Sequence, residues 1–263
     1  MIPLATEQGT PDWHVFRGRG IGGSDVAAIM GLSPWKSRAE LLQEKVTGKR
    51  DTISNFAMAR GTRLEPIARA LYEARAGCRA VPVCVQHDTI PWARASLDGL
   101  CSRDGTRWLC EIKCPAWDQH ARTLAGDEVP TYYRCQMQWQ LFVCCLDRND
   151  YVSYSDNSEF SEGERIVVVP VPADLEYQAE LLRECTRFWE AVLEGRREYE
   201  ATGVYAGERT VGQILADEER ELERQLVEMG LAPVGQLGRR DNAAVLSEIE
   251  AGMKLAAEPG WWS

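Results

Sequence analysis

The sequence feature that most constrains the fold is a pair of short apolar runs separated by Asp104-Gly105. The runs cover residues 93–100 and 107–114. Asp-Gly between two β-prone runs is typical of a hairpin with a two-residue turn. The sequence therefore predicts two antiparallel strands whose register is set by the turn.

This register places three charged side chains on one face of the hairpin. Asp98 lies directly opposite Glu111, and Lys113 points the same way from two residues along. Directly opposed Cβ atoms are roughly 4.5–5.5 Å apart, and like charges there destabilise a sheet. A cation between the carboxylates removes the repulsion, so the hairpin predicts a site for a divalent metal and a water nucleophile. The alternative is that Asp98 opens a turn with Gly99 and that Glu111 and Lys113 lie on a solvated face.

Composition limits the classes of protein to consider. A chain of 263 residues that is 44% hydrophobic can bury one sizeable core and carry an appendage. No apolar run approaches the length of a membrane span, and no basic segment followed by an apolar one opens the chain, so we expect a cytoplasmic protein without membrane contact. The nine cysteines lie mainly in apolar runs without a C-x-x-C pair, which indicates reduced thiols rather than disulfides, a zinc site or an iron–sulfur cluster.

The formal net charge of −10 argues against a protein that binds nucleic acid over its whole surface. Any contact with DNA then has to come from a local basic patch. One candidate is the glycine-rich segment 17–31, which is expected to lead into a helix with Ser24 as N-cap and Gly31 as C-terminal stop. Free backbone N–H groups beside Arg17 and Arg19 would form an anion site. The alternative is an ordinary capped helix with solvated arginines.

The remaining pattern predicts alternating helices and strands. A capping box at Ser37 opens a helix to about Val46, with Gly48 ending it. Pro82 places its strand at an edge or a bulge. Further helices are expected at 53–76, 130–146 and 174–196, and further strands at 80–86, 151–154 and 165–171.

Two of these helices carry polar side chains of interest. Glu65 lies in the first, just before Pro66, which marks a kink or a restart. Thr62 and Glu65 also match a capping box, a purely structural alternative. In the helix after residue 130, Tyr133, Gln136 and Gln140 share one face.

The pattern changes after residue 200. Helices are expected at 210–229 and 241–257, and the chain ends with Trp261-Trp262-Ser. We expect one folded domain over residues 1–200 and a helical C-terminal extension over 201–263. The extension is either a solvated arm or a docking surface for another subunit or partner, with the two tryptophans as anchors.

Five motifs occur in a fixed order along the chain. They are R-G-R-G-I-G-G-S-D-V-A-A-I-M-G-L-S-P-W at 17–35, G-x-x-x-E at 61–65, S-L-D-G at 96–99, E-I-K-C-P at 111–115 and Y-x-x-Q at 133–136. Together they resemble YqaJ-type viral recombinases, the group that includes phage lambda exonuclease. The resemblance covers about residues 13–200, and residues 201–263 have no counterpart in it.

The resemblance implies an α/β fold with a PD-(D/E)xK restriction-endonuclease-like core, in which helices flank a mixed central sheet. It also implies a metal-dependent DNA exonuclease that hydrolyses phosphodiesters of linear duplex DNA from the 5′ end and produces single strands for phage-type recombination. The implied partners are a single-strand annealing protein and two further copies of the chain, in a ring-shaped homotrimer. The implied location is the cytoplasm of a bacterial host cell, and the implied origin is a phage or prophage.

The resemblance also assigns catalytic roles. Asp98 and Glu111 would bind Mg²⁺, with Mn²⁺ as a substitute, and the Ile112 carbonyl would be a further ligand. Glu65 would join them from its helix. Lys113 would orient the attacking water and stabilise the developing charge on the phosphate.

The expected contacts to DNA complete the set. Arg17 and Ser24 would hold a 5′ phosphate, and Tyr133 and Gln136 would line the active site. Leu97 stands where the family motif has proline, and only the aspartate that follows carries chemistry. Two other functions stay open: an endonuclease or nickase on the same fold, and a DNA-end-binding protein without cleavage, against which the presence of all four catalytic residues argues.

Overall fold

The computed structural model describes residues 1–49 and 56–207, which belong to a compact unit, Met1–Glu208. The helices expected at 210–229 and 241–257, and the tryptophans Trp261 and Trp262, lie outside the described residues.

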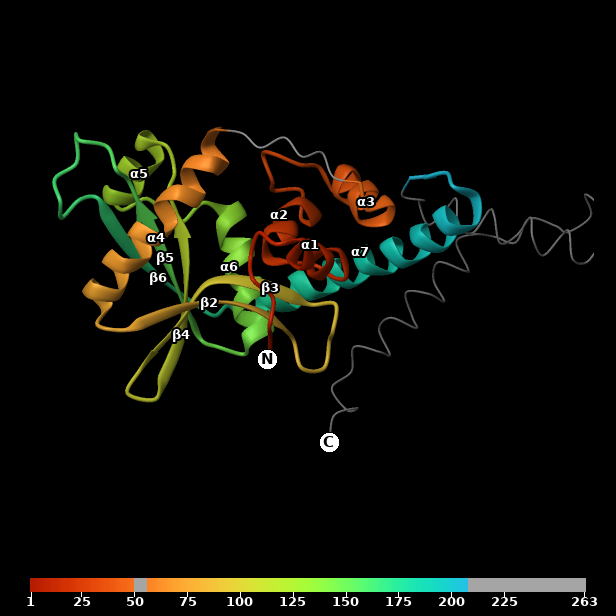
Figure 1. Ribbon diagram of the computed structural model, residues 1–263, viewed down its shortest axis with the longest axis horizontal. Coiled ribbons are helices and arrows are strands. Elements are labelled where there is room, and N and C mark those ends of the chain that lie inside the picture. Colours follow the sequence, from red (N-terminus) through yellow and green to blue (C-terminus); the bar gives the residue numbers. More distant parts are fainter. Residues whose placement is uncertain (50–55, 208–263) are drawn as a thin grey trace, which may run out of the picture. The chain divides into compact units, whose positions relative to one another are not determined.

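Six strands form one mixed sheet in which the spatial order follows the chain order (Figure 1). All neighbours are antiparallel except β4 and β5, which run parallel. The strands are β1 (Ile2–Leu4), β2 (Arg79–Gln86), β3 (Arg94–Arg103), β4 (Thr106–Lys113), β5 (Arg148–Tyr154) and β6 (Ile166–Pro172).

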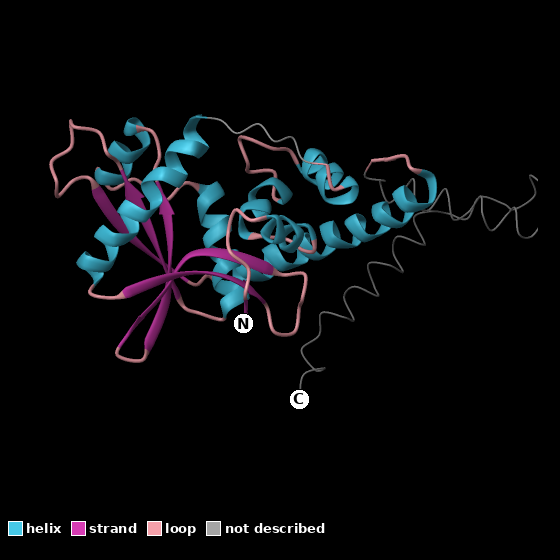
Figure 2. Cartoon of the chain, viewed as in Figure 1, coloured by secondary structure: helices cyan, strands magenta, loops and turns pink. Residues whose placement is uncertain are grey.

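Helices lie on both faces of this sheet (Figure 2). They are α1 (Pro11–Gly18), α2 (Gly23–Ile29), α3 (Arg38–Thr47), α4 (Phe56–Ala76), α5 (Trp117–Leu124), α6 (Thr131–Cys144) and α7 (Leu175–Thr202). On one face Tyr72 of α4 packs in a cluster with Trp108 of β4. On the other, Trp139 of α6 packs in a cluster with Leu97 and Leu109. The expected mixed sheet flanked by helices is confirmed.

The hairpin between β3 and β4 has the predicted turn and register. Asp104 and Gly105 have φ angles of 51° and 80°, as a type I′ turn requires. Pairing runs from Arg103–Thr106 at the turn to Gly99–Cys110. The predicted register is therefore confirmed, and Asp98 and Glu111 are the next two residues beyond its last pair.

The bulge predicted at Pro82 is also present. Val81 pairs with Leu100 whereas Val83 pairs with Leu97, so Asp98 and Gly99 together face one proline. A bulge turns a side chain away from its regular alternation and is common beside active sites. Gly99 is required here, because a Cβ atom at this position would meet Cys110 Sγ at 2.5 Å.

The parallel pairing of β4 and β5 needs a long crossover. Helices α5 and α6 supply it, and α6 packs against β3, β2 and β5. The crossover therefore lays the polar side of α6 over the same face of the sheet as Glu111.

One predicted helix start was wrong, and one of the two alternatives at Pro66 is excluded. Helix α2 begins at Gly23 with Gly22 as N-cap, because the Asp25 carboxylate accepts the Gly22 N–H at 2.9 Å, and Ser24 is the second helical residue. Helix α4 runs through Pro66 as one helix, so no restart occurs there. The capping role considered for Thr62 is excluded, since its hydroxyl donates to the Met58 carbonyl inside α4.

Two general expectations concern the whole chain. None of the helices in the described ranges is long and apolar enough to cross a membrane. All nine cysteines are free thiols, and most of them are buried.

Candidate active site

Strands β3 and β4 separate after the Gly99–Cys110 pair, and the site lies at this fork. The Ile112 N–H donates to Asp98 Oδ2 at 2.9 Å. The Leu97 carbonyl accepts instead from Gln8 Nε2 at 2.9 Å. Side chains thus replace the backbone hydrogen bond that would have continued the ladder. Because the N–H and C=O of a strand residue point to the same side, the Ile112 carbonyl also faces the fork.

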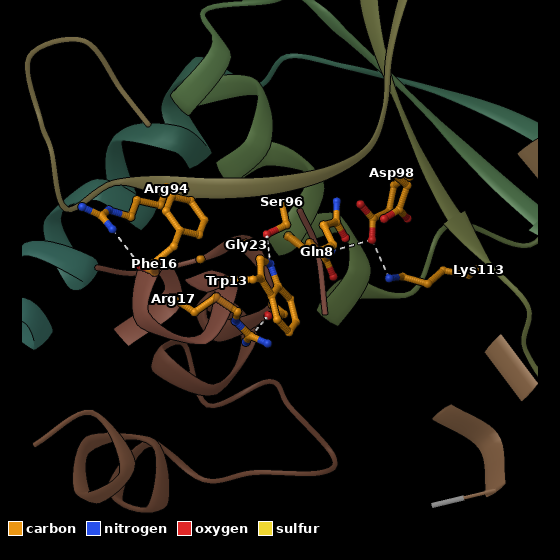
Figure 3. Close-up of a pocket in the computed structure, with 13 residues that line it drawn as sticks. Gln8, Trp13, Phe16, Arg17, Gly23, Arg94, Ser96, Asp98 and Lys113 are labelled. Atoms are coloured by element: carbon orange, nitrogen blue, oxygen red, sulfur yellow. Dashed lines mark hydrogen bonds and ion pairs between the residues drawn. The ribbon is translucent and has the colours of Figure 1, made fainter. Parts of the chain in front are cut away.

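A cavity of about 150 Å³ opens at the fork (Figure 3). Six residues singled out from the sequence line it: Arg17, Ser24, Asp98, Glu111, Lys113 and Gln136. Tyr133 lies beside it, with Lys113 Nζ 5.1 Å from its ring centroid. The structure therefore brings together residues that are more than a hundred positions apart in the chain.

Glu111 is fully buried and held by three donors. Its Oε1 accepts from Lys113 Nζ and from Gln136 Nε2, each at 2.5 Å. Its Oε2 accepts from Gln140 Nε2 at 2.5 Å, and Asn149 Nδ2 donates to Gln140 Oε1 at 2.8 Å. This network fixes the carboxylate against the sheet.

The ionised form of Asp98 is disfavoured by its surroundings. Burial and the nearby Glu111 carboxylate raise the pKa of Asp98 well above its ordinary value of 3.8, although Lys113 opposes the shift. Burial by itself would lower the pKa of Lys113, but Glu111 and Asp98 raise it, so the side chain stays an ammonium ion. Two carboxylates beside one ammonium leave excess negative charge, and oxygen donors of this kind suit a divalent cation.

Glu65 does not join the two carboxylates as a ready third ligand. It forms an ion pair with Arg69, one turn further along α4. Arg69 Nε in turn donates to the Asp98 carbonyl at 3.0 Å. Within residues 1–49 and 56–207, no three His, Cys, Asp or Glu side chains gather closely enough to hold a metal ion. Glu65 nevertheless contributes to the raised pKa of Asp98, and its role at a metal stays a prediction.

The opposite end of the cavity is cationic. Arg17 Nη2 donates to Ser24 Oγ at 2.9 Å and to Asp25 Oδ1 at 3.2 Å, and its guanidinium lies 4.9 Å from the centroid of the Trp13 ring. Trp13 Nε1 donates to Ser96 Oγ at 2.8 Å. Figure 3 shows Arg17 at one end and Asp98 and Lys113 at the other, with Trp13 and Ser96 between them.

A buried ion pair supports this cationic end. Lys45 Nζ contacts Asp25 Oδ2 at 2.7 Å and donates to the carbonyls of Arg17 and Gly20, both at 2.8 Å. Burial would raise the pKa of Asp25, but Lys45 and Arg17 hold it well below its ordinary value. Gly20 lies so close to the backbone of Trp92 that an added Cβ would meet its carbonyl oxygen at 2.3 Å. The glycine-rich segment is therefore fixed by packing and by a buried lysine.

Residues 12–147 match the model of the YqaJ-like viral recombinase domain. The chain belongs to this family. A YqaJ protein of Bacillus subtilis is 29% identical over 142 residues, which are 52% of this chain and 43% of the relative. The YqaJ domain described here thus spans less than half the length of that relative.

Solved structures support the same relationship. The alkaline exonuclease LHK-Exo from Laribacter hongkongensis is 29% identical, with a TM-score of 0.64 over 74% of this chain and 98% of that one. Its complex with dAMP gives 30% identity and a TM-score of 0.63 with the same coverage. The shared mixed sheet confirms the expected PD-(D/E)xK-like α/β fold of the YqaJ domain.

Sequence reasoning missed three residues of the site in this YqaJ domain: Gln8, Trp13 and Ser96. One of them carried a readable signal. Trp13 precedes Arg17 by four residues on a helix, which puts the two side chains on one face. Gln140, predicted to share a helix face with Tyr133 and Gln136, is at the site and donates to Glu111. Nothing local points to Gln8, whose partner Leu97 is 89 positions away.

Proposed function

We propose that this chain is a metal-dependent DNA exonuclease that hydrolyses one strand of linear duplex DNA from its 5′ end. The observation that carries the proposal is the two-ended cavity. One end holds the Asp98 and Glu111 carboxylates beside the Lys113 ammonium, and the other holds Arg17 and Ser24. The first end suits phosphodiester hydrolysis, and the second suits a phosphate group.

The carboxylate end would hold Mg²⁺, or Mn²⁺ in its place, through Asp98 and Glu111. The Ile112 carbonyl is a further donor at the fork, and Glu65, which pairs with Arg69 through Oε1, would offer its other oxygen. The charge balance supports this assignment, since Asp98 carries a raised pKa that a cation would relieve. A divalent ion at this position supplies a water of lowered pKa and neutralises charge on the phosphate.

The protein's own groups have distinct tasks in this proposal. Lys113 keeps its proton beside Glu111 and can donate to a phosphoryl oxygen as charge develops there. Gln136 and Gln140 hold the Glu111 carboxylate in one orientation. Tyr133 places its ring against the Lys113 ammonium and limits where that side chain can move.

The cationic end would account for a preference for strand termini. A 5′ phosphate monoester carries more charge than an internal diester and presents more unsubstituted oxygens to Arg17 and Ser24.

The biological setting is proposed from the family. Strands produced in this way would feed phage-type homologous recombination in the cytoplasm of a bacterial host, with a single-strand annealing protein as partner and a homotrimer as the assembly. The name of the matched family, a viral recombinase domain, supports this setting.

A plasmid assay tests the activity. Supercoiled circles, nicked circles and linear duplex labelled at either 5′ end are incubated with and without Mg²⁺. We expect loss of the linear form alone, dependent on Mg²⁺, with early release of the 5′ label. Cleavage of supercoiled circles would favour the endonuclease or nickase. Binding of ends without digestion under all conditions would favour the end-binding protein.

Asp98→Asn is the control for contaminating nucleases. It removes one ionisable oxygen with little change in shape, and we expect digestion to fall by at least about a hundredfold. Digestion at the wild-type rate by this variant would contradict the assignment of the site.

A further inference from the structure

A group of three rings, here called the aromatic surface, lies next to the Lys113 end of the cavity, with one ring exposed and two half-buried. It consists of Trp35, Tyr132 and Tyr133. The centroids of Trp35 and Tyr132 are 5.0 Å apart with the rings edge to face, and those of Tyr132 and Tyr133 are 4.4 Å apart. Trp35 is 66% exposed, although it is among the largest apolar side chains of the protein.

The aromatic surface is continuous with the candidate active site. Tyr133 lies 5.1 Å from Lys113 Nζ on one side and stacks on the buried Tyr151 on the other, with 5.9 Å between ring centroids. The ring of Trp35 lies 6.2 Å from that of Tyr133, measured between centroids. The inner ring is thus anchored in the core, while the outer ring projects into solvent.

Packing within the chain does not account for Trp35. A tryptophan that served the core would be mostly buried, because its contribution to stability scales with the apolar area removed from water. The two basic residues adjacent in sequence do not make the surface a phosphate site either. Lys36 forms an ion pair with Glu44 and Arg134 forms one with Asp174. The surface therefore offers ring faces and edges to a ligand.

We propose that Trp35, supported by Tyr132, stacks on a nucleobase of the DNA strand that enters the cavity. The inference rests on the proposed nuclease function. If a strand phosphate contacts Lys113, the adjoining nucleotides lie within reach of the rings next to that ammonium. Stacking on aromatic side chains is tolerant of sequence, since every base has a π face. The occupant is thus a base close to the scissile phosphate.

The test pairs a protein variant with a missing base. Linear duplexes carry one abasic residue at each of the first several positions of either strand, and kcat/KM is measured for the wild type and for Trp35→Ala. We expect the wild type to lose roughly fivefold to a hundredfold at one position. Trp35→Ala should show a similar loss on intact DNA and no additional loss at that position. Trp35→Phe, which keeps a π face, should retain most of the wild-type response.

Two controls separate the possible failures. Leu175→Ala removes another exposed apolar side chain, 75% exposed at the start of α7, and should behave as wild type on every duplex. Equal responses of wild type and Trp35→Ala at every abasic position would overturn the stacking proposal. A changed sedimentation of Trp35→Ala with an unchanged abasic profile would also overturn it, and would assign Trp35 to a protein interface. Failure of the wild type to digest any duplex would instead remove the proposed function itself.

Discussion

Arg17 is fixed by its neighbours rather than left to solvent. Ser24 and Asp25 each contact its guanidinium, and Trp13 lies against it. A fixed guanidinium loses little side-chain freedom when it binds a phosphate, so more of the interaction is available for binding. At the scale of the residue, this geometry makes Arg17 the group that should read the chemistry of the strand end.

We expect Arg17→Ala to reduce the preference for 5′-phosphorylated ends. Loss of a charged hydrogen bond of about 1.5–3 kcal/mol should slow digestion of phosphorylated ends about tenfold or more and leave 5′-hydroxyl ends nearly unchanged. Single-turnover digestion of both substrates measures the ratio. Arg183→Ala, a change at an exposed arginine of α7, is the matched control. Equal slowing of both substrates by Arg17→Ala would reject the phosphate site.

The pair formed by Asp25 and Lys45 predicts a dependence of stability on pH. The pKa of Asp25 in the folded protein lies below its ordinary value of 3.8 because of Lys45 and Arg17. The contribution to stability is therefore complete above pH 3.8 and is lost as the pH falls toward the lowered pKa, where the unfolded chain binds the proton first. Lys45→Met takes the closer of the two cations from the buried carboxylate and leaves Arg17 at 3.2 Å, and it should cost up to about 3–5 kcal/mol at neutral pH.

Urea denaturation at a series of pH values measures both effects. Asp25→Asn should flatten the acid side of the stability profile relative to the wild type. Asp12→Asn, a change at an exposed aspartate, should keep the wild-type slope. An unchanged acid slope in Asp25→Asn would show that the ion pair does not contribute as argued.

At the scale of the element, local signals predicted what local chemistry determines. The β3–β4 hairpin follows from Asp104-Gly105, since this dipeptide accepts the two positive φ angles of the turn. Helix α3 follows from a capping box that the structure contains at Ser37 and Glu40. Helix α1 has only a capping threonine, Thr10, whose hydroxyl accepts the Trp13 N–H at 3.3 Å, and Trp13 stands where a capping box has Glu or Gln, so the local signal is weaker.

Competition between neighbouring groups explains the errors. Ser24 and Asp25 are both residue types that cap helix starts. The Asp25 carboxylate accepts the Gly22 N–H, so Gly22 is the N-cap and Ser24 lies inside the helix. Glu65 pairs with Arg69 at the i,i+4 spacing. The sequence shows this spacing, but it does not tell whether Glu65 pairs with the arginine or binds a metal. The contact between Gln8 and the Leu97 carbonyl joins distant segments, and no local pattern predicts it. The catalytic roles assigned to the site stay predictions.

At the scale of the whole molecule, the Asp98 and Glu111 carboxylates at the fork place negative charge where it opposes folding. Asp98 is ionised only at a cost, because burial and Glu111 both disfavour its charge. A raised pKa in the folded state means that this carboxylate favours folding at low pH and opposes it as the pH rises through the raised value. A cation bound at the fork would remove that opposition.

We therefore expect Mg²⁺ to raise the thermal midpoint of the wild type at neutral pH, since an ion that binds only the folded state stabilises it. Asp98→Asn should be more stable than the wild type without the ion and should respond little to its addition. Differential scanning calorimetry with Mg²⁺ or EDTA measures both. A Mg²⁺ response of Asp98→Asn equal to that of the wild type would place the ion elsewhere.

The strand order that follows the chain has a consequence for how the protein folds. Neighbours joined by short turns, such as β3 and β4, close small loops and can pair early, whereas the parallel pairing of β4 with β5 must wait for the intervening helices. Asp98 and Glu111 are then brought together before Gln136 and Gln140 arrive. The last kinetic step of refolding should be the one that locks Glu111, so that recovery of catalytic turnover lags behind recovery of the hairpin.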